Sequence, residues 1–188
     1  MSAKADTIHV LAIAGSLRKG SLNRALVRAA RQVAPPGLLV EDVDLDGIPL
    51  YNEDNEKPQP EKVRLLKAKI VAADALLIAT PEYDNSIPGV LKNAIDWASR
   101  PYGDNSFEDK PVAIMSAGAS GGGVRAQLAL RQIFVFLNMH PLNKPSVIVM
   151  NAKTRVDPSG EFTDPAIRDS VKQLLVALEA WTRRLKKG

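Results

Sequence analysis

The sequence contains no cysteine among its 188 residues. Disulfide bonds, thiolate catalysis and cysteine-ligated zinc sites are therefore excluded. Only two histidines occur, His9 and His140, which excludes a histidine-rich metal site. A chain that needs no disulfides suits the reducing cytoplasm, which is where we expect it to work.

Long apolar runs and a large surplus of one charge sign are also missing. Residues 1–7 lack the charged-then-apolar order of a signal peptide, and the apolar run 8–14 is too short to span a bilayer. Lys and Arg total 25 against 21 Asp and Glu, a net charge of +4. This weak balance suits an anionic ligand such as a phosphate, whereas nucleic-acid binding requires clustered basic stripes. We expect neither membrane insertion nor nucleic-acid binding.

What the chain does contain is an alternation of short apolar runs and amphipathic segments. The runs predict strands at 8–14, 38–45, 75–80, 112–117 and 145–150, with the acidic run 38–45 nearer an edge. The segments predict helices at 23–33, 61–72, 88–99 and 124–139, and a long one opened by Asp164 and Pro165. This alternation predicts an α/β fold with a doubly wound parallel sheet, in a single domain over residues 1–188. Ligands of such sheets bind beyond the carboxyl ends of the strands, so we expect the site in the loops after the first, third and fourth strands.

The first of these loops, residues 15–23, reads GSLRKGSLN. It leads into a helix, whose N-terminus exposes unpaired N–H groups and a partial positive charge that suit an anion. Ser16, Ser21 and Asn23 add short donors, and Arg18 adds a charged fork. The glycines have Walker A spacing, but Ser21 replaces the lysine, which argues against ATP or GTP. On its own, the loop fits a phosphate site and a serine-capped helix with solvated cations equally well.

The loop after the third predicted strand, residues 80–89, contains two prolines, Pro81 and Pro88. Proline fixes φ, so both residues stiffen the segment. Between them lie an aromatic ring, several polar groups and free backbone donors. Such a loop suits a planar heterocycle with donors and acceptors on its edge. Taken alone, a proline-bounded turn into a helix is the simpler interpretation.

The two loops together resemble a known family, the NADPH-dependent FMN reductases and their chromate- or quinone-reducing relatives. The matching segments are 15–23, 81–83 (PEY), Ser86, 88–89 (PG), 91–97 (LKNAIDW) and 48–52 (IPLYN). The similarity spans essentially the whole chain. It implies a flavodoxin-like three-layer sandwich with a five-stranded parallel sheet in the order 2-1-3-4-5.

The resemblance also implies the cofactor FMN, with NADPH or NADH as electron donor. The residues that would hold the FMN phosphate are Ser16, Arg18, Ser21, Leu22 and Asn23. Those that would face the isoalloxazine, largely through backbone groups, are Pro81, Glu82 and Tyr83. Ser116, Ala117 and Gly118 would line its pyrimidine side.

Asp84 completes the predicted site and departs from the family, which usually has Asn after Pro-Glu-Tyr. An ionised Asp only accepts hydrogen bonds, so a side chain facing the flavin should disfavour the anionic reduced form. A side chain facing solvent should change little. The sequence leaves both orientations open.

A glycine-rich segment, residues 121–126 (GGGVRA), matches the G-x-G-x-x-A pattern of dinucleotide-binding folds. That fingerprint should follow the first strand and precede an acidic residue by about 20 positions. Here it follows the fourth predicted strand, and residues 124–156 contain no Asp or Glu. We therefore interpret it as a flexible loop beside the flavin.

The predicted helix 124–139 is apolar nearly all round. One face holds Leu130, Ile133, Phe134 and Leu137, and another holds Val135, Phe136 and Met139. A helix of this kind is buried on two sides. Packing between the sheet and a partner subunit would bury it, and the resemblance also implies a homodimer or homotetramer. A deeply buried helix in a monomer is the alternative.

These features predict an enzyme, an FMN-dependent NAD(P)H:acceptor oxidoreductase. It would reduce quinones, and also chromate or other small oxidants, by a two-step (ping-pong) hydride transfer. The cofactor carries that chemistry, so we expect no catalytic protein acid or base and no metal. Two alternatives stay open: a flavodoxin-type electron carrier, although such carriers tend to be acidic, and a cofactor-free regulatory or interaction protein on the same fold.

Overall fold

A computed structural model describes residues 7–187. The prediction that residues 1–7 form no signal peptide therefore falls almost entirely outside the described residues. Six strands form one parallel sheet in the order β2-β1-β3-β4-β5, with β6 also paired to β4. The strands are β1 (Ile8–Ala14), β2 (Leu38–Val43), β3 (Ala75–Thr80), β4 (Pro111–Ala117), β5 (His140–Pro141) and β6 (Val147–Val149). The expected order is confirmed, and the acidic strand β2 lies at an edge.

Five α-helices cover the sheet, as the sequence predicts. They are α1 (Leu22–Val33), α2 (Glu61–Ala72), α3 (Gly89–Ala98), α4 (Val124–Phe136) and α5 (Pro165–Leu185), with short 3₁₀ turns at Glu53–Asn55 and Ala152–Thr154. Asp164 opens α5 as expected, because its side chain accepts a hydrogen bond from the N–H of Ala166 at 2.9 Å. No helix within residues 7–187 has the length and apolar character that a bilayer crossing requires.

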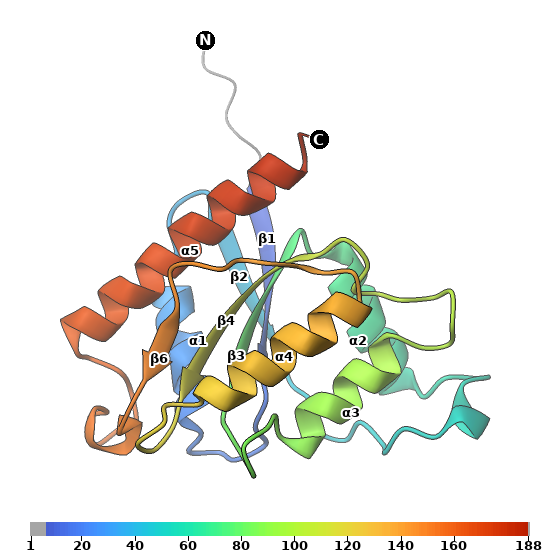
Figure 1. The fold of residues 1–188 in the computed structure, drawn as a ribbon, viewed down its shortest axis with the longest axis horizontal. Coiled ribbons are helices and arrows are strands. Elements are labelled where there is room, and N and C mark those ends of the chain that lie inside the picture. Colours follow the sequence, from blue (N-terminus) through green and yellow to red (C-terminus); the bar gives the residue numbers. More distant parts are fainter. Residues whose placement is uncertain (1–6, 188) are drawn as a thin grey trace.

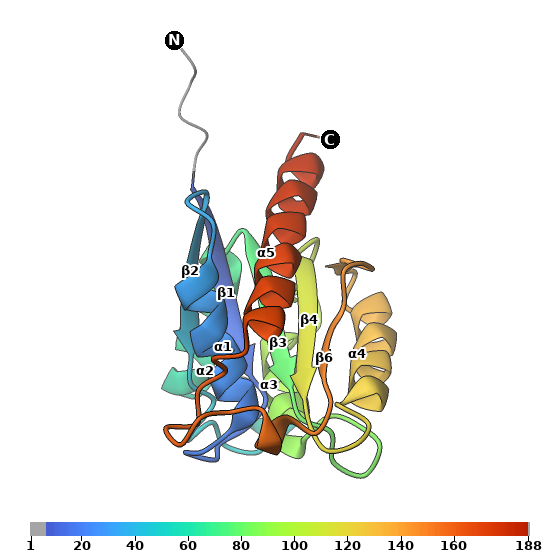
Figure 2. The same cartoon turned by 90° about the vertical axis from the view of Figure 1, so that its left-hand side faces the viewer.

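Two apolar layers sandwich the sheet. Alternate residues of β1 point to opposite faces, so Val10 and Ala12 pack with α1 and α5, whereas Leu11 and Ile13 pack with α2, α3 and α4. Figures 1 and 2 show α1 and α5 on one side of the sheet and α2 and α3 on the other. The carboxyl ends of the strands meet at the bottom of Figure 1, opposite the C-terminal end of α5.

The predicted fifth strand, residues 145–150, is wrong in extent. Within that range the structure has only the short strand β6, which pairs with the end of β4, and the unpredicted short strand β5 lies before the range and pairs with the beginning of β4. Residues 142–146 lie between them. Pro145 has no N–H to donate to a ladder, and the strand that the apolar run predicts from residue 145 begins only at Val147.

The predicted end of the fourth helix at Met139 is also wrong. The helix α4 ends at Phe136, and Asn138 follows with a left-handed φ of 52°. Asn tolerates this conformation and commonly ends a helix. The turn directs Met139 back into the core, where it is 6% exposed, so it does not share the outer face of Val135 and Phe136.

Candidate functional site

A cavity of about 390 Å³ opens at the carboxyl edge of the sheet. Four loops line it, after β1, β3, β4 and β6. The lining residues are Ser16, Arg18, Ser21, Leu22, Asn23, Pro81, Glu82, Tyr83, Ala117, Gly118, Ala119, Asn151, Lys153 and Thr154. The structure therefore brings together every predicted site residue except Asp84 and Ser116.

The first turn of α1 presents free backbone donors to this cavity. Ser21 caps the helix, since its side chain accepts from the N–H of Arg24 at 3.3 Å. Among the described residues, the N–H groups of Leu22 and Asn23 have no acceptor. Unpaired N–H groups and the positive end of the helix dipole at one point form a ready site for an anion.

Asn23 is buried, and its side chain fixes that first turn to the end of β4. Its Nδ2 donates to the carbonyl oxygen of Ala117 at 2.9 Å, and its Oδ1 accepts from the Ala117 N–H at 3.0 Å. The paired bonds satisfy the N–H and the carbonyl of Ala117, which follows the last pair of β3 with β4, Thr80 with Ser116. Asn23 therefore offers the cavity its backbone N–H, while its side-chain oxygen is already used.

Two cations line the cavity without a partner. The side chains of Arg18 and Lys153 make no hydrogen bond or ion pair with the described residues. Arg24, close by in sequence, is instead paired with Asp44 at 2.5 Å and also donates to the carbonyl oxygen of Ser16 at 3.1 Å. The free positive charge of the site is therefore that of Arg18 and Lys153.

The Asp44 carboxylate supports this end of the site from behind. Burial by itself would raise the pKa of Asp44, but the backbone N–H of Asp46 and the Arg24 guanidinium hold the pKa below its usual value. The ionised carboxylate thus keeps Arg24 in place against Ser16.

At the other end of the cavity, the loop after β3 folds into a tight turn. Tyr83 and Ser86 exchange backbone hydrogen bonds of 3.1 and 2.9 Å. Between them Asp84 and Asn85 adopt left-handed φ values of 49° and 62°, a conformation that Asp and Asn adopt more readily than most residues. Asp84 is exposed and lies outside the cavity lining.

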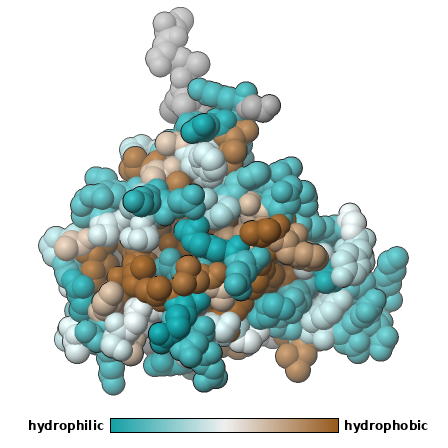
Figure 3. Space-filling model, viewed as in Figure 1, coloured by the Kyte–Doolittle hydropathy of each residue, from teal (hydrophilic) through white to brown (hydrophobic). Residues whose placement is uncertain are grey.

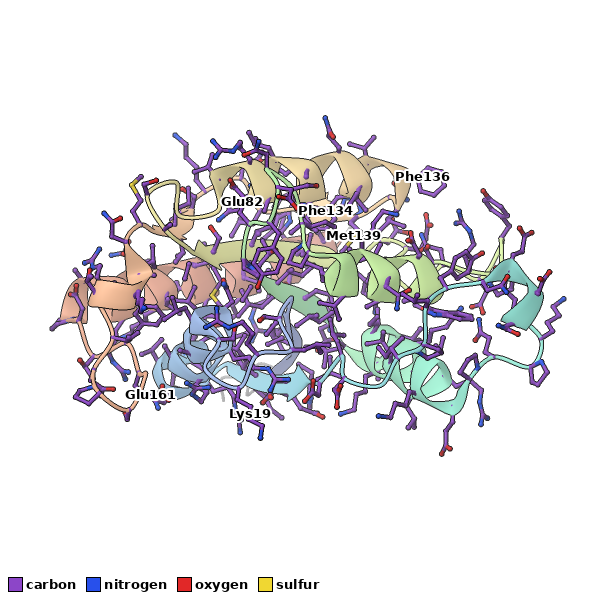
Figure 4. The ribbon with its side chains drawn as sticks, turned by 90° about the horizontal axis from the view of Figure 1, so that it is seen from below. Lys19, Glu82, Phe134, Phe136, Met139 and Glu161 are labelled. Carbon is purple, nitrogen blue, oxygen red and sulfur yellow. The ribbon has the colours of Figure 1, made fainter. Side chains whose placement is uncertain are left out.

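Glu82 lines the cavity and points its carboxylate at the beginning of α4 (Figure 4). Its Oε1 accepts from Nε of Arg125 and its Oε2 from the N–H of Arg125, both at 2.9 Å. The N–H of Glu82 itself has no acceptor among the described residues, nor has that of Ala119 across the cavity. These backbone donors are available to the edge of a flat ligand.

The glycine-rich loop packs tightly around the end of β4. Gly122 and Gly123 have φ values of 60° and 93°, and a Cβ atom on Gly123 would lie 2.7 Å from the Cβ of Ser116. Ser116 is fully buried and accepts a hydrogen bond of 2.8 Å from Nε2 of Gln127. Successive strand residues face opposite ways, so Ser116 lies beneath the cavity floor while Ala117 lines it.

Helix α3, which contains the matching segment 91–97, holds a neighbouring loop. Asn93 accepts from the N–H of Tyr51 at 2.7 Å and donates to the carbonyl oxygen of Pro49 at 2.9 Å. The Trp97 indole also donates to Pro49, at 2.8 Å. These residues of α3 thus anchor residues 48–52, which also belong to the resemblance, without lining the cavity themselves.

Sequence reasoning missed the loop after β6. The N–H groups of Asn151 and Ala152 donate to the carbonyl oxygens of Ala119 and Gly118, both at 2.9 Å, which fixes this loop beside the one after β4. Asn151, Lys153 and Thr154 thereby reach the cavity. The rule that all carboxyl ends of a parallel sheet meet at one edge applied to this loop too.

Known proteins are similar to this chain in sequence and in fold. The sequence model of a family described as NADPH-dependent FMN reductase matches residues 8–154. An NAD(P)H-dependent FMN reductase of Pseudomonas aeruginosa is 50% identical, over 96% of this chain and 98% of its own length. An NADPH:quinone oxidoreductase of Arabidopsis thaliana is 43% identical, over 95% and 94%. The structure of FerB, a flavoenzyme NAD(P)H:(acceptor) oxidoreductase from Paracoccus denitrificans, matches with a TM-score of 0.85 and 33% identity, over 95% and 98%.

Proposed function

The chain belongs to the NADPH-dependent FMN reductase family, and from this premise we propose that it reduces quinones with electrons from NAD(P)H by a two-step, ping-pong cycle. Relatives over nearly the whole chain are named as FMN reductases and as quinone oxidoreductases. The observation that carries the proposal is the charge of the cavity: Arg18 and two free N–H groups meet at one end, and a second unpaired cation, Lys153, also lines the cavity.

We propose that this end holds the FMN phosphate. The N–H groups of Leu22 and Asn23 would donate to it, and Arg18 and Lys153 would neutralise it. Ser16 and Ser21 would stand beside it with their hydroxyl groups. The residues thus fit the group chemically, because a dianion would supply a partner to the free N–H groups of Leu22 and Asn23 and to the two unpaired cations.

The opposite end would hold the isoalloxazine. The backbone of Pro81, Glu82 and Tyr83 would face the ring from one side, and Ala117, Gly118 and Ala119 would line the other. The free N–H groups of Glu82 and Ala119 suit the polar edge of such a ring. Tyr83 is half exposed, so its ring can stack on a flat acceptor at the cavity mouth.

Bound FMN would supply the electron chemistry, taking a hydride from NAD(P)H and passing electrons to an acceptor. The chain supplies binding and orientation, and its cavity lining contains neither histidine nor cysteine to act as a general acid or base. Small oxidants other than quinones, chromate included, would use the same open face.

Absorption spectroscopy and stopped-flow kinetics test the proposal. Purified protein should be yellow, or turn so with FMN, and the flavin absorbance should bleach on mixing with NADPH or NADH and return with a quinone. Parallel double-reciprocal lines would support the two-step order. An electron carrier would bind FMN without rapid bleaching, and a cofactor-free protein would bind none; either result overturns the proposal.

We also propose that two copies of the chain assemble through α4. Its outer face exposes Leu128, Val135 and Phe136, with Val135 83% exposed. Figure 3 shows apolar surface gathered over this part of the molecule, and in Figure 4 Phe136 projects away while Phe134 and Met139 face inward. Exposed apolar surface of this kind typically marks a protein interface.

Light scattering tests the assembly. The wild-type chain should have the mass of a dimer or tetramer, and Val135→Arg should shift it toward the monomer. Val176→Arg on α5 is the matched control, since Val176 is also an exposed valine of a helix. A monomeric wild type, or a Val135→Arg variant that stays assembled, would contradict the proposal.

The predicted cytoplasmic location stays a prediction that cell fractionation would test.

A further inference from the structure

The first turn of α4 lacks a cap of its own. Its N-cap residue is Gly123, which has no side chain to accept the N–H groups that open a helix. The N–H of Val124 reaches the carbonyl oxygen of Gly121 at 3.2 Å, and that of Gln127 reaches Gly123 at 3.1 Å. Two N–H groups, of Arg125 and Ala126, are left without a backbone partner.

Glu82 accepts both of them from another part of the chain. Its Oε2 lies 2.9 Å from the N of Arg125 and 3.4 Å from the N of Ala126, and its Oε1 takes the Arg125 guanidinium. The carboxylate is largely enclosed, with its side chain 14% exposed. Glu82 is 43 residues away from Arg125, so this is a tertiary cap and not a local one.

The ion pair between Glu82 and Arg125 would by itself contribute little to holding the loop after β3. The Arg125 side chain is 60% exposed, and exposed ion pairs contribute little to stability. The backbone bonds differ, because a carboxylate at a helix N-terminus gains charge-assisted hydrogen bonds and a favourable dipole interaction. Glu82 is thus tied to α4 chiefly through groups that no side-chain substitution on α4 removes.

We propose that Glu82 is a positioning residue of the flavin site: by capping α4 it fixes the backbone of Pro81 and Tyr83 against the ring. The inference rests on the proposed function, because it assigns the ring to that loop. The carboxylate itself is held on α4 and serves neither as a proton donor nor as a side-chain ligand of the flavin.

The carboxylate also offsets the positive end of α4 next to the ring. Without its charge, the helix end would favour negative charge on its neighbour, and thus the reduced over the oxidised flavin. Glu82→Gln should then shift the midpoint potential of bound FMN to more positive values. A tenfold change in the ratio of the two affinities corresponds to about 30 mV for a two-electron couple.

Hydrogen exchange of the FMN-free protein tests the cap. Glu82→Ala should speed exchange at the N–H groups of Arg125 and Ala126 at least tenfold and leave the centre of α5 unchanged. Arg125→Ala is the matched control, since it removes the guanidinium but keeps both backbone bonds, and it should leave that exchange near the wild-type rate. Unchanged exchange in Glu82→Ala would overturn the inference.

FMN titration and potentiometry complete the test. Glu82→Ala should weaken FMN binding about tenfold, and Glu82→Gln should bind FMN with a more positive potential. An unaltered potential in Glu82→Gln would refute the charge effect. If the wild-type chain fails to bind FMN, the proposed function fails, whereas the exchange result still decides whether Glu82 caps α4.

Discussion

The two ends of the cavity are built in opposite ways. At the end formed by α1, the cation Arg18 and the first N–H groups of the helix have no partner among the described residues, and the cavity lining adds a second unpaired cation, Lys153. At the end formed by the loop after β3, the one charged side chain in the lining, Glu82, is already bound to α4. One end keeps its charge for a ligand, and the other uses its charge to hold the loop.

This difference orients the ligand. An anionic group gains most where cations and free N–H groups have not been neutralised, so the phosphate belongs at the α1 end. A largely neutral ring needs a rigid surface and a few backbone donors, which Pro81 and the turn after it supply. The arrangement of unpaired groups, more than the number of polar residues, therefore distinguishes the two ends.

The largest effect is expected from Asn23→Ala, which removes the link between the two sides of the phosphate end. Both bonds to Ala117 are buried, and their loss leaves a strand-end N–H and carbonyl unpaired. We expect unfolding free energy to fall by roughly 2–4 kcal/mol. Chemical denaturation of the FMN-free protein measures it.

Two further variants test whether the loss of stability comes from the buried bonds between Asn23 and Ala117. Asn143→Ala, which removes an exposed amide bonded to Arg131, should change stability by less than about 0.5 kcal/mol. Asn23→Asp keeps the acceptor for the Ala117 N–H but turns a second acceptor toward the Ala117 carbonyl oxygen in a buried site, so it should lose at least as much stability as Asn23→Ala. Equal stability of Asn23→Ala and wild type would show that the bonds to Ala117 are dispensable.

A sharper test of the difference between the two cavity ends uses FMN and riboflavin, which differ by the phosphate. Lys153→Ala and Arg18→Ala should each weaken FMN binding about tenfold, the free energy of one charge-assisted contact, and leave riboflavin binding unchanged. Fluorescence titration measures both ligands. Lys19→Ala is the control, because Lys19 is basic and adjacent but lies outside the cavity lining and points away in Figure 4. Equal losses for riboflavin would place the two cations at the ring instead.

The sheet and most of the cavity could be predicted from the sequence. Buried parallel strands are continuous apolar runs, and their loops must meet at one edge, so residues such as Ser16, Pro81 and Ala117 come together in the structure. Hydrophobic pattern also identified the inner face of α4, including Leu130 and Phe134.

The features that the sequence could not predict depend on hydrogen bonds between residues that are far apart in the sequence. The capping of α4 by Glu82 joins residues 43 apart, and no local signal encodes it. The orientation of Asn23 toward Ala117 likewise required the relative position of α1 and β4. Lys153 was missed because we expected the site only in the loops after the first, third and fourth strands, although β6 ends at Val149 close to the predicted end at Met150.

A smaller loss of stability is expected when the pH falls, because the Asp44 carboxylate behind the phosphate end becomes protonated. Its pKa lies below the ordinary value, so its contribution to stability is complete above about pH 4 and is lost as the pH falls through the folded-state value. The pair with Arg24 is partly exposed, which limits the effect to under about 1 kcal/mol. Asp44→Asn should remove this part of the acid sensitivity in denaturation curves from pH 7 to pH 3; an identical pH slope would contradict it.

The smallest effect is expected from Asp84→Asn, which restores the residue usual in the family. Asp84 occupies a left-handed turn position, is exposed and lies outside the cavity lining, so its charge is screened by water. Asn also tolerates the left-handed conformation. FMN affinity and potential should therefore match wild type within about twofold and a few millivolts. A clear rise in potential would mean that the Asp84 charge reaches the ring, and that the ring end is not free of unpaired charge as the comparison requires.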